Sequence, residues 1–391
     1  MLELQWFAGQ FDDLLNRYLR IAVTAEGAFL ARFDADWHCL ESENTHLVAQ
    51  SRLIHNFSVG YRVTGRPEYK LALVKGTDFL LHVFWDHEKG GFYNICGRSG
   101  IVADDCKASY GQSFALFALA HAALTLHDDR YRQAAFIAWQ TIQDRFADQN
   151  GGLLPLLTRN FVLLPSLNSQ NPLMHLLEAL LELQKLDSSR TVHKAVDRLI
   201  RFVVCHLRDK DGYLPEIYTA DWQPCDRQQG GRIDLGHHFE WAYLLSQAVH
   251  LGHAEEFLGV GHQMLNLALA NAVDSKDGGV RSPLSMDRSL EGAKKCWWEQ
   301  CEAIRAILRY IRAHGKHDLE PILEQIVRFV DRYFIDHKRG GWYTCVDGVE
   351  IAPADQNKSD YGKVYYHVIG MCLEAFAYFL KGEATVVSRS T

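Results

Sequence analysis

Histidine and glutamate stand three residues apart at two places in the chain, and a double-glutamate variant occurs at a third. These pairs are His175 with Glu178, His237 with Glu240, and Glu299 with Glu302. Residues i and i+3 of a helix share one face, about 5–6 Å apart at Cβ. A carboxylate at that distance holds an imidazole in one tautomer and raises its basicity, as general-base catalysis requires.

The same spacing also occurs in metal-binding helical bundles, which use His and Glu at i, i+3. Here the further ligands would have to come from helices that carry Arg52 and Gln112, which are poor donors for such a metal. We therefore expect no metal and no cofactor.

Six polar residues recur at a nearly constant interval in otherwise apolar surroundings. They are Arg52, Gln112, His175, His237, Glu299 and His367, separated by 60, 63, 62, 62 and 68 residues. Buried polar groups cost free energy unless they are paired, so a ring of them predicts a ligand-binding cup. His238 lies about 100° around the helix from His237, so we expect a structural role for it.

Aromatic residues flank these polar positions. They are Tyr110, Trp241, Trp297, Trp298, Tyr365 and Tyr366. Aromatic faces beside hydrogen-bonding groups suit a sugar, which has apolar C–H faces and polar edges. We therefore include Tyr110 and Trp298 with Gln112 and Glu299 among the substrate-binding candidates.

Six glycine turns at nearly constant spacing indicate the repeating elements that position these residues. The first glycines of the turns are Gly27, Gly90, Gly151, Gly212, Gly278 and Gly340, at intervals of 61 to 66 residues. A repeat of about 60 residues has room for two helices and their loops.

The segments before each turn are amphipathic: 66–83, 128–146, 188–207, 254–272 and 317–335. The segments after each turn are apolar on every side: 109–126, 172–186, 235–251, 298–313 and 362–381. Since a helix that is apolar all round is buried, the pattern predicts an outer and an inner helix per repeat. We expect an all-α fold, an (α/α)6 barrel of six helical hairpins around a central cavity. A single domain spans residues 1–391, with a frayed tail at about 383–391.

Composition excludes several classes of protein. The net charge is −7, with no cluster of Lys and Arg, which argues against a nucleic-acid partner. No apolar run reaches the length of about 20 residues that a membrane span needs, and no signal peptide is visible. The nine cysteines show no C-x-x-C spacing, and Cys205 and Cys372 fall in apolar helical stretches as expected of reduced core residues. We expect a cytoplasmic protein, monomeric or homodimeric.

Five segments together resemble the N-acylglucosamine 2-epimerase superfamily, and they occur in the right order over nearly the whole chain. They are SRLIHNFS (51–58), YGQSF (110–114), NPLMHLLEA (171–179), GHHFEW (236–241) and KVYYH (363–367). The resemblance implies an (α/α)6 barrel and metal-free 1,2-chemistry on a reducing sugar. The run RLIHNFS is closer to the mannose and sulfoquinovose isomerase type, whereas WWEQCEA (297–303) has Glu299 where the family pattern has proline.

The resemblance also implies site residues. Two essential histidines of the family map to His237 and His367, and substrate-binding positions map to Arg52, Tyr110, His175 and Glu240. Asn171, which opens the third segment, joins the substrate-binding set. We expect a monosaccharide substrate such as mannose, from which His367 removes the C2 proton to give a cis-enediol while Arg52 stabilises the developing charge. Proton return to C1 gives the ketose.

Three alternatives stay open at this point. Proton return to C2 by His237 would make the protein a 2-epimerase of the mannose–glucose, cellobiose or N-acylglucosamine type. A glycoside hydrolase of the (α/α)6 type would need two nearby carboxylates, for which Asp105, Glu240 and Glu302 are candidates. A sugar-binding protein without turnover would need the cup but not two bases. A phosphorylated or sulfonated sugar would call for further cations, which Lys107, Lys294 and Lys295 offer.

Overall fold

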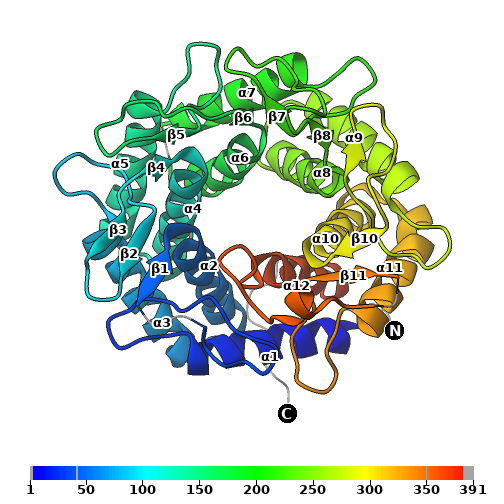
Figure 1. Ribbon diagram of the computed structural model, residues 1–391, viewed down its shortest axis with the longest axis horizontal. Helices are drawn as coiled ribbons and strands as arrows, with labels where there is room; N and C mark the ends of the chain where they lie inside the picture. The colour runs from blue at the N-terminus through cyan, green and yellow to red at the C-terminus, as the bar shows by residue number, and fades with distance from the viewer. Residues whose placement is uncertain (1–2, 41–42, 188, 349, 382–391) are drawn as a thin grey trace.

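A computed structural model of the chain describes residues 3–40, 43–187, 189–348 and 350–381. The expected tail at 383–391 lies outside the described residues. In the described part, twelve α-helices form two concentric layers around a central axis (Figure 1). The expected (α/α)6 barrel is confirmed.

Six helices line the centre and are buried over most of their length. They are α2 (Leu47–Thr64), α4 (Ser109–Leu126), α6 (Asn171–Leu183), α8 (Leu235–His250), α10 (Trp297–His314) and α12 (Tyr366–Phe379). Helix α4 shows why: apart from Gln112, His121 and a few small hydroxyl side chains its sequence is apolar, so neither face is suited to water.

Six amphipathic helices form the outer layer. They are α1 (Leu4–Ile21), α3 (Pro67–Phe79), α5 (Asp129–Arg145), α7 (Thr191–Phe202), α9 (Glu256–Ala272) and α11 (Glu320–Tyr333). Short turns of other helix types extend them: η1 (Leu80–Phe84) after α3, η3 (Val203–Leu207) after α7, and η4 (His317–Leu319) before α11. Two further short helices are η2 (Gln184–Leu186) and η5 (Pro353–Gln356).

Each inner helix packs against the outer helix that follows it in the chain, because only a few residues separate them. Between α2 and α3 the connection is Gly65, in the left-handed conformation with φ 68°, and Arg66, after which Pro67 starts the next helix. The last inner helix, α12, has no such successor and packs instead against α1, the first helix of the chain (Figure 1).

The first and last helices of the ring therefore lie side by side. The indole nitrogen of Trp6 in α1 donates to Asp331 in α11 (2.9 Å), and that of Trp342 donates to Gln10 in α1 (2.8 Å). An isolated strand bridge between Phe33 and Ser359 adds a second connection between the first and last repeats. These contacts close the ring.

Short antiparallel strand pairs surround the end of the barrel at which the inner helices begin. The strands are β1 (Asn44–His46), β2 (Ile95–Gly97), β3 (Val102–Asp104), β4 (Lys107–Ala108), β5 (Leu156–Leu157), β6 (Asn168–Ser169), β7 (Ile217–Tyr218), β8 (Arg232–Ile233), β9 (Leu284–Ser285), β10 (Lys294–Cys296) and β11 (Cys345–Asp347). They pair as β1–β2–β3, β4–β5, β6–β7, β8–β9 and β10–β11. In each pairing except β2–β3, a strand that leads into an inner helix meets a strand that follows the next glycine turn.

Cysteines behave differently from the sequence expectation at three positions. Cys296 and Cys345 form a disulfide that joins β10 to β11. Cys205 is exposed in η3, so its interpretation as a core residue is wrong, whereas Cys372 is buried as expected. Cys205 lies six residues after Leu199, which at about 100° per residue places it away from the buried face of α7.

The polar residues at constant spacing are not structurally equivalent. The equivalent positions are Gln50, Gln112, His238, Gln300 and Tyr365, and each accepts a hydrogen bond from the backbone N–H two residues after the first glycine of a turn. Gln112, for example, accepts from Phe92 N (2.9 Å) and donates to Phe92 O (2.8 Å). These five side chains fasten the glycine turns to the inner helices, and the structural role expected for His238 is confirmed.

None of the described helices is both long and apolar enough to cross a membrane.

Candidate active site

A buried arginine lies in the inner helix α2, at the end of the barrel where the inner helices begin. Arg52 in α2 donates through Nη2 to the Tyr110 hydroxyl of α4 (2.8 Å) and through Nη1 to the carbonyl of Gly362. Its guanidinium also lies 4.4 Å from the ring centre of Phe114 and 5.0 Å from that of Tyr366. The cation is thus held in one orientation, with only 3% of the residue exposed.

The first candidate catalytic histidine, His237, is the third residue of α8. Its Nδ1 lies 2.8 Å from Glu216 Oε2, and Gln170 Nε2 donates to the same carboxylate oxygen (2.8 Å). Trp241 in turn donates to Gln170 Oε1 (2.6 Å), which fixes the amide orientation. Burial lowers the pKa of His237, but the negative charges of Glu216 and Asp234 outweigh burial and raise it to about 10. His237 is therefore an imidazolium at neutral pH, with Nδ1–H on Glu216 and Nε2–H left to donate.

The second candidate, His367, lies in the first turn of α12. Its Nδ1 is 2.7 Å from Glu302 Oε1 in α10. Burial, and then the positive charge of Arg52, hold the pKa of His367 well below its usual value. Burial raises the pKa of Glu302 to about 7 against the opposing charge of Arg305. His367 is therefore neutral, and with Nδ1–H on Glu302 its Nε2 carries a free lone pair, as a general base requires.

Trp298 stands beside both histidines. Its ring centre is 4.8 Å from that of His237 and 5.8 Å from that of His367. The two histidines therefore border one aromatic ring.

A third set of groups closes the site from α6 and α8. His175 contacts Glu178 (Nδ1–Oε2 3.4 Å) and lies 3.9 Å from Glu240 Oε1, and its ring meets that of Tyr110 edge-on at 5.3 Å. Burial lowers the pKa of His175 to about 4. Both carboxylate oxygens of Glu240 are buried without a hydrogen-bond partner in the described structure. Burial, and then the charges of Glu302 and Glu178, raise the pKa of Glu240 well above its usual value, so it is a neutral acid.

Two groups of three side chains in this site have metal-ligand character. They are His175, Glu178 and Glu240, and Glu240, Glu302 and His367, with donor atoms within 4.8 Å of one another in each group. Two of these side chains already have partners outside the groups: Tyr366 donates to Glu178, and Arg305 forms ion pairs with Glu178 and Glu302. That no metal acts here stays a prediction.

The structure brings together seven of the ten residues singled out from the sequence. They are Arg52, Tyr110, His175, His237, Glu240, Trp298 and His367. Asn171 begins α6 next to Gln170, and its amide oxygen is buried without a partner among the described residues, so substrate contact by Asn171 stays a prediction.

Two of the ten have structural partners instead. Gln112 uses its amide oxygen and nitrogen on the Phe92 backbone, and Glu299 accepts from Cys296 N (3.0 Å) in a capping box at the start of α10. These hydrogen bonds give Gln112 and Glu299 structural roles, and substrate contact by either residue stays a prediction. The constant spacing marks the positions that fasten the glycine turns as well as positions one or two residues away.

The three lysines proposed as phosphate or sulfonate partners are also committed elsewhere. Lys107 is buried on Asp86 (3.0 Å), Lys295 on Asp274 (3.2 Å), and Lys294 pairs with Asp355 (2.8 Å). These ion pairs hold the loops, so the extra cations do not serve the site. Asp105 is exposed, outside the buried carboxylate group of the cup.

Sequence reasoning missed Glu216 and Gln170. Glu216 directly precedes β7 and Gln170 directly precedes α6. Both therefore lie at the end of the barrel but outside the segments that the apolar periodicity predicts to be helices. The available signal was an isolated carboxylate in the apolar run 213–218, since a buried charge needs a partner.

Comparison with known proteins gives consistent relatives. The family model N-acylglucosamine 2-epimerase (GlcNAc 2-epimerase) matches residues 27–371. D-mannose isomerase of Marinomonas mediterranea is 26% identical over 372 residues, covering 91% of this chain and 93% of its own. Cellobiose 2-epimerase of Bacteroides fragilis is 22% identical over 369 residues, with the same coverage. A crystal structure of a D-mannose isomerase superposes with a TM-score of 0.89 at 23% identity, covering 96% of this chain and 98% of that one.

Proposed function

We propose that this chain, which belongs to the N-acylglucosamine 2-epimerase family, interconverts a free aldose and its ketose, as mannose and fructose, through a cis-enediol. The observation that carries the proposal is the pair of buried histidines of opposite protonation on the Trp298 surface. The similarity to D-mannose isomerase supports the choice of sugar.

The first step assigned to this pair is opening of the sugar ring. His237, an imidazolium, donates the proton of Nε2 to the ring oxygen as the C1–O5 bond breaks, while the C1 hydroxyl loses its proton to solvent and C1 becomes the aldehyde carbon. Arg52 and neutral Glu240 offer N–H and O–H donors to the oxygens at C1 and C2, where negative charge develops next.

The second step is proton transfer at carbon. Neutral His367 takes the C2 proton at Nε2, which leaves an enediolate with its charge on O1. The proton of the C2 hydroxyl passes to O1, C2 becomes the carbonyl carbon, and His367, whose proton exchanges with solvent, delivers a proton to C1 to give the ketose. One base serves both carbons on one face of the enediol. This supports isomerisation over 2-epimerisation, which needs a second base on the opposite face, and His237 carries a proton in the resting site.

The 2-epimerase reading stays the second candidate because cellobiose 2-epimerase covers the chain as fully as the isomerase does. In that reading His237 becomes neutral once it has protonated the ring oxygen. It then takes a proton from solvent and delivers that proton to C2 from the opposite face.

Nuclear magnetic resonance of products in D₂O tests the proposal. Purified protein is incubated separately with mannose, glucose, fructose, cellobiose and a nitrophenyl mannoside. We expect mannose and fructose to interconvert, with deuterium entering fructose C1 and mannose C2. Glucose from mannose as the first product would replace the proposal with the epimerase, and release of nitrophenol would replace it with a hydrolase.

A further inference from the structure

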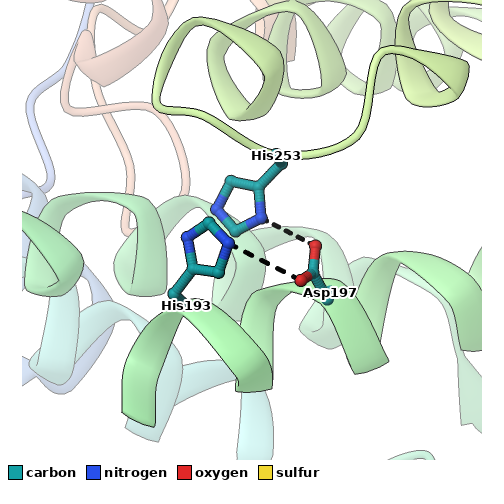
Figure 2. A group of neighbouring side chains, drawn as sticks. All are labelled: His193, Asp197 and His253. Atoms are coloured by element: carbon teal, nitrogen blue, oxygen red, sulfur yellow. Dashed lines mark hydrogen bonds and ion pairs between the residues drawn. The ribbon is translucent and has the colours of Figure 1, made fainter. Parts of the chain in front are cut away.

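Two histidines and an aspartate meet on the outer layer, and one of them, His253, follows the C-terminal end of α8, whereas His237 of the proposed active site lies at its start. His193 and Asp197 lie one turn apart on α7, and His253 lies in the loop between α8 and α9 (Figure 2). His253 Nδ1 is 2.8 Å from Asp197 Oδ1, and His193 Nε2 is 3.7 Å from Asp197 Oδ2. Both imidazoles thus direct a nitrogen toward the same carboxylate.

The tautomer of His253 is fixed by a neighbouring amide. Gln184 Nε2 donates to Leu251 O (3.2 Å), so Gln184 Oε1 is the atom that faces His253 Nε2 at 2.8 Å. That oxygen only accepts, so His253 carries its hydrogen on Nε2. In the neutral ring, Nδ1 then presents a lone pair to the Asp197 carboxylate, an arrangement of two acceptors that needs a cation between them.

We propose that a divalent first-row transition metal, of which Zn²⁺ is the model, binds between His193, Asp197 and His253. Two imidazoles and one carboxylate form a donor set that such ions prefer. Donation of the second ring N–H of His253 to an amide oxygen is the arrangement that orients metal-binding histidines. A shared proton would need only His253 and Asp197, whereas a metal also uses His193.

The distances suit this ion after small adjustments. Metal–ligand bonds of about 2.1 Å in a tetrahedral site separate the donor atoms by about 3.4 Å. His253 Nδ1 is 2.8 Å from Oδ1 of Asp197 and His193 Nε2 is 3.7 Å from its Oδ2, and one ligand atom from each residue lies within 4.8 Å of the others. The His193 ring, stacked on His253 at 4.0 Å and 13°, has to tilt for its lone pair to reach the metal.

Exposure gives the metal a route in. The His253 side chain is fully buried, whereas 17% of His193 and 34% of Asp197 are exposed. The metal therefore enters from solvent, with water in the remaining position. Because its ligands come from α7 and from the loop before α9, it would join two adjacent outer helices of the ring and stabilise the outer layer.

Thermal unfolding with and without metal tests the site. Chain without an affinity tag is treated with a chelator, and its melting temperature is measured before and after addition of Zn²⁺. At a hundred times the dissociation constant we expect a rise of about 3 °C for a chain of this length. Co²⁺ should give visible absorption bands of a site with nitrogen and oxygen ligands.

Variants decide which residues bind the metal. His193→Ala and Asp197→Asn should abolish the rise, measured against each variant's own metal-free melting temperature. His317→Ala is the matched control, since it removes an exposed histidine paired with Glu320 at 2.8 Å, and it should keep the full rise. No rise and no Co²⁺ bands in the unmodified chain, or a rise that survives in both ligand variants, would overturn the proposal.

Discussion

Two histidine–carboxylate pairs of nearly equal geometry face one tryptophan, yet they hold their protons differently. His237 is 2.8 Å from Glu216 and His367 is 2.7 Å from Glu302. Opposing charges raise the pKa of His237 to about 10, whereas burial and Arg52 keep the pKa of His367 well below its usual value. The distance within a pair therefore does not decide its charge.

What differs is the surroundings of each carboxylate. Burial raises the pKa of Glu216, but the charge of His237 and the hydrogen bonds from His237 and Gln170 outweigh burial and lower it. Glu302 lies near a second buried carboxylate, Glu178, which helps burial to raise the pKa of Glu302 to about 7. An ionised carboxylate keeps a proton on its histidine, and a carboxyl group that is half neutral does not.

The largest effect is expected from removing the base. His367→Asn keeps a polar side chain but has no basic nitrogen, so kcat should fall by about 10²–10⁴-fold. Deuterium exchange at C2, followed by nuclear magnetic resonance, should fall with it. Exchange at the normal rate would show that the base lies elsewhere and that the two pairs have been assigned in reverse.

Glu216→Gln should remove the difference in protonation between His237 and His367. Without the carboxylate, the pKa of His237 returns toward the ordinary value of about 6.5, so only about 3% of the acid form remains at pH 8 and activity there should fall about 30-fold. Since the acid must be protonated, the alkaline limb of the pH–rate profile should move to lower pH. A profile identical to that of the unmodified chain would contradict the ion pair.

Glu302→Gln is the matched change in the other pair and should have a smaller effect. Because the pKa of Glu302 is about 7, a neutral amide imitates its protonated form, and activity at pH 6 should stay within about threefold. Above pH 7 the unmodified chain gains an anion that the variant lacks, so the deficit should grow with pH. Equal losses at pH 6 and pH 9 would argue that Glu302 is ionised throughout.

A change outside both pairs should affect stability and not chemistry. Gln112→Leu leaves the N–H and C=O of Phe92 without their partner, which should lower the free energy of unfolding by about 1–3 kcal/mol. Denaturant unfolding measures this loss, and kcat should be unchanged within about twofold. A large fall in kcat at full occupancy of the folded state would restore Gln112 to the substrate-binding set.

The barrel was predictable because glycine turns and apolar periodicity are local signals. The histidines and Arg52 could be found for a related reason, since polar residues on apolar helices are conspicuous. Which of the regularly spaced polar residues face the site and which fasten a glycine turn was not predictable. Gln112 and His175 differ in position by two residues relative to their turns, and only the fold shows that one fastens a loop while the other lies beside Tyr110.

Protonation was beyond sequence reasoning as well. The His-x-x-Glu pattern pairs His237 with Glu240, but in the structure His237 is hydrogen-bonded to Glu216, 21 residues earlier in the chain. Glu240 is left unpaired and neutral. A pKa depends on every charge around the group, and those charges come from loops and helices that are distant in the chain.

The packing of α1 against α12 has a consequence for synthesis of the chain. A helix made at the start must wait for one made more than 300 residues later before its apolar side is covered. During translation, Phe7 and Phe11 of α1 therefore lack their native partners in α12, Phe379 and Phe376, until nearly the whole chain has left the ribosome. Closure of the ring is the contact of longest range in the molecule, and we expect it to be the slow step of folding.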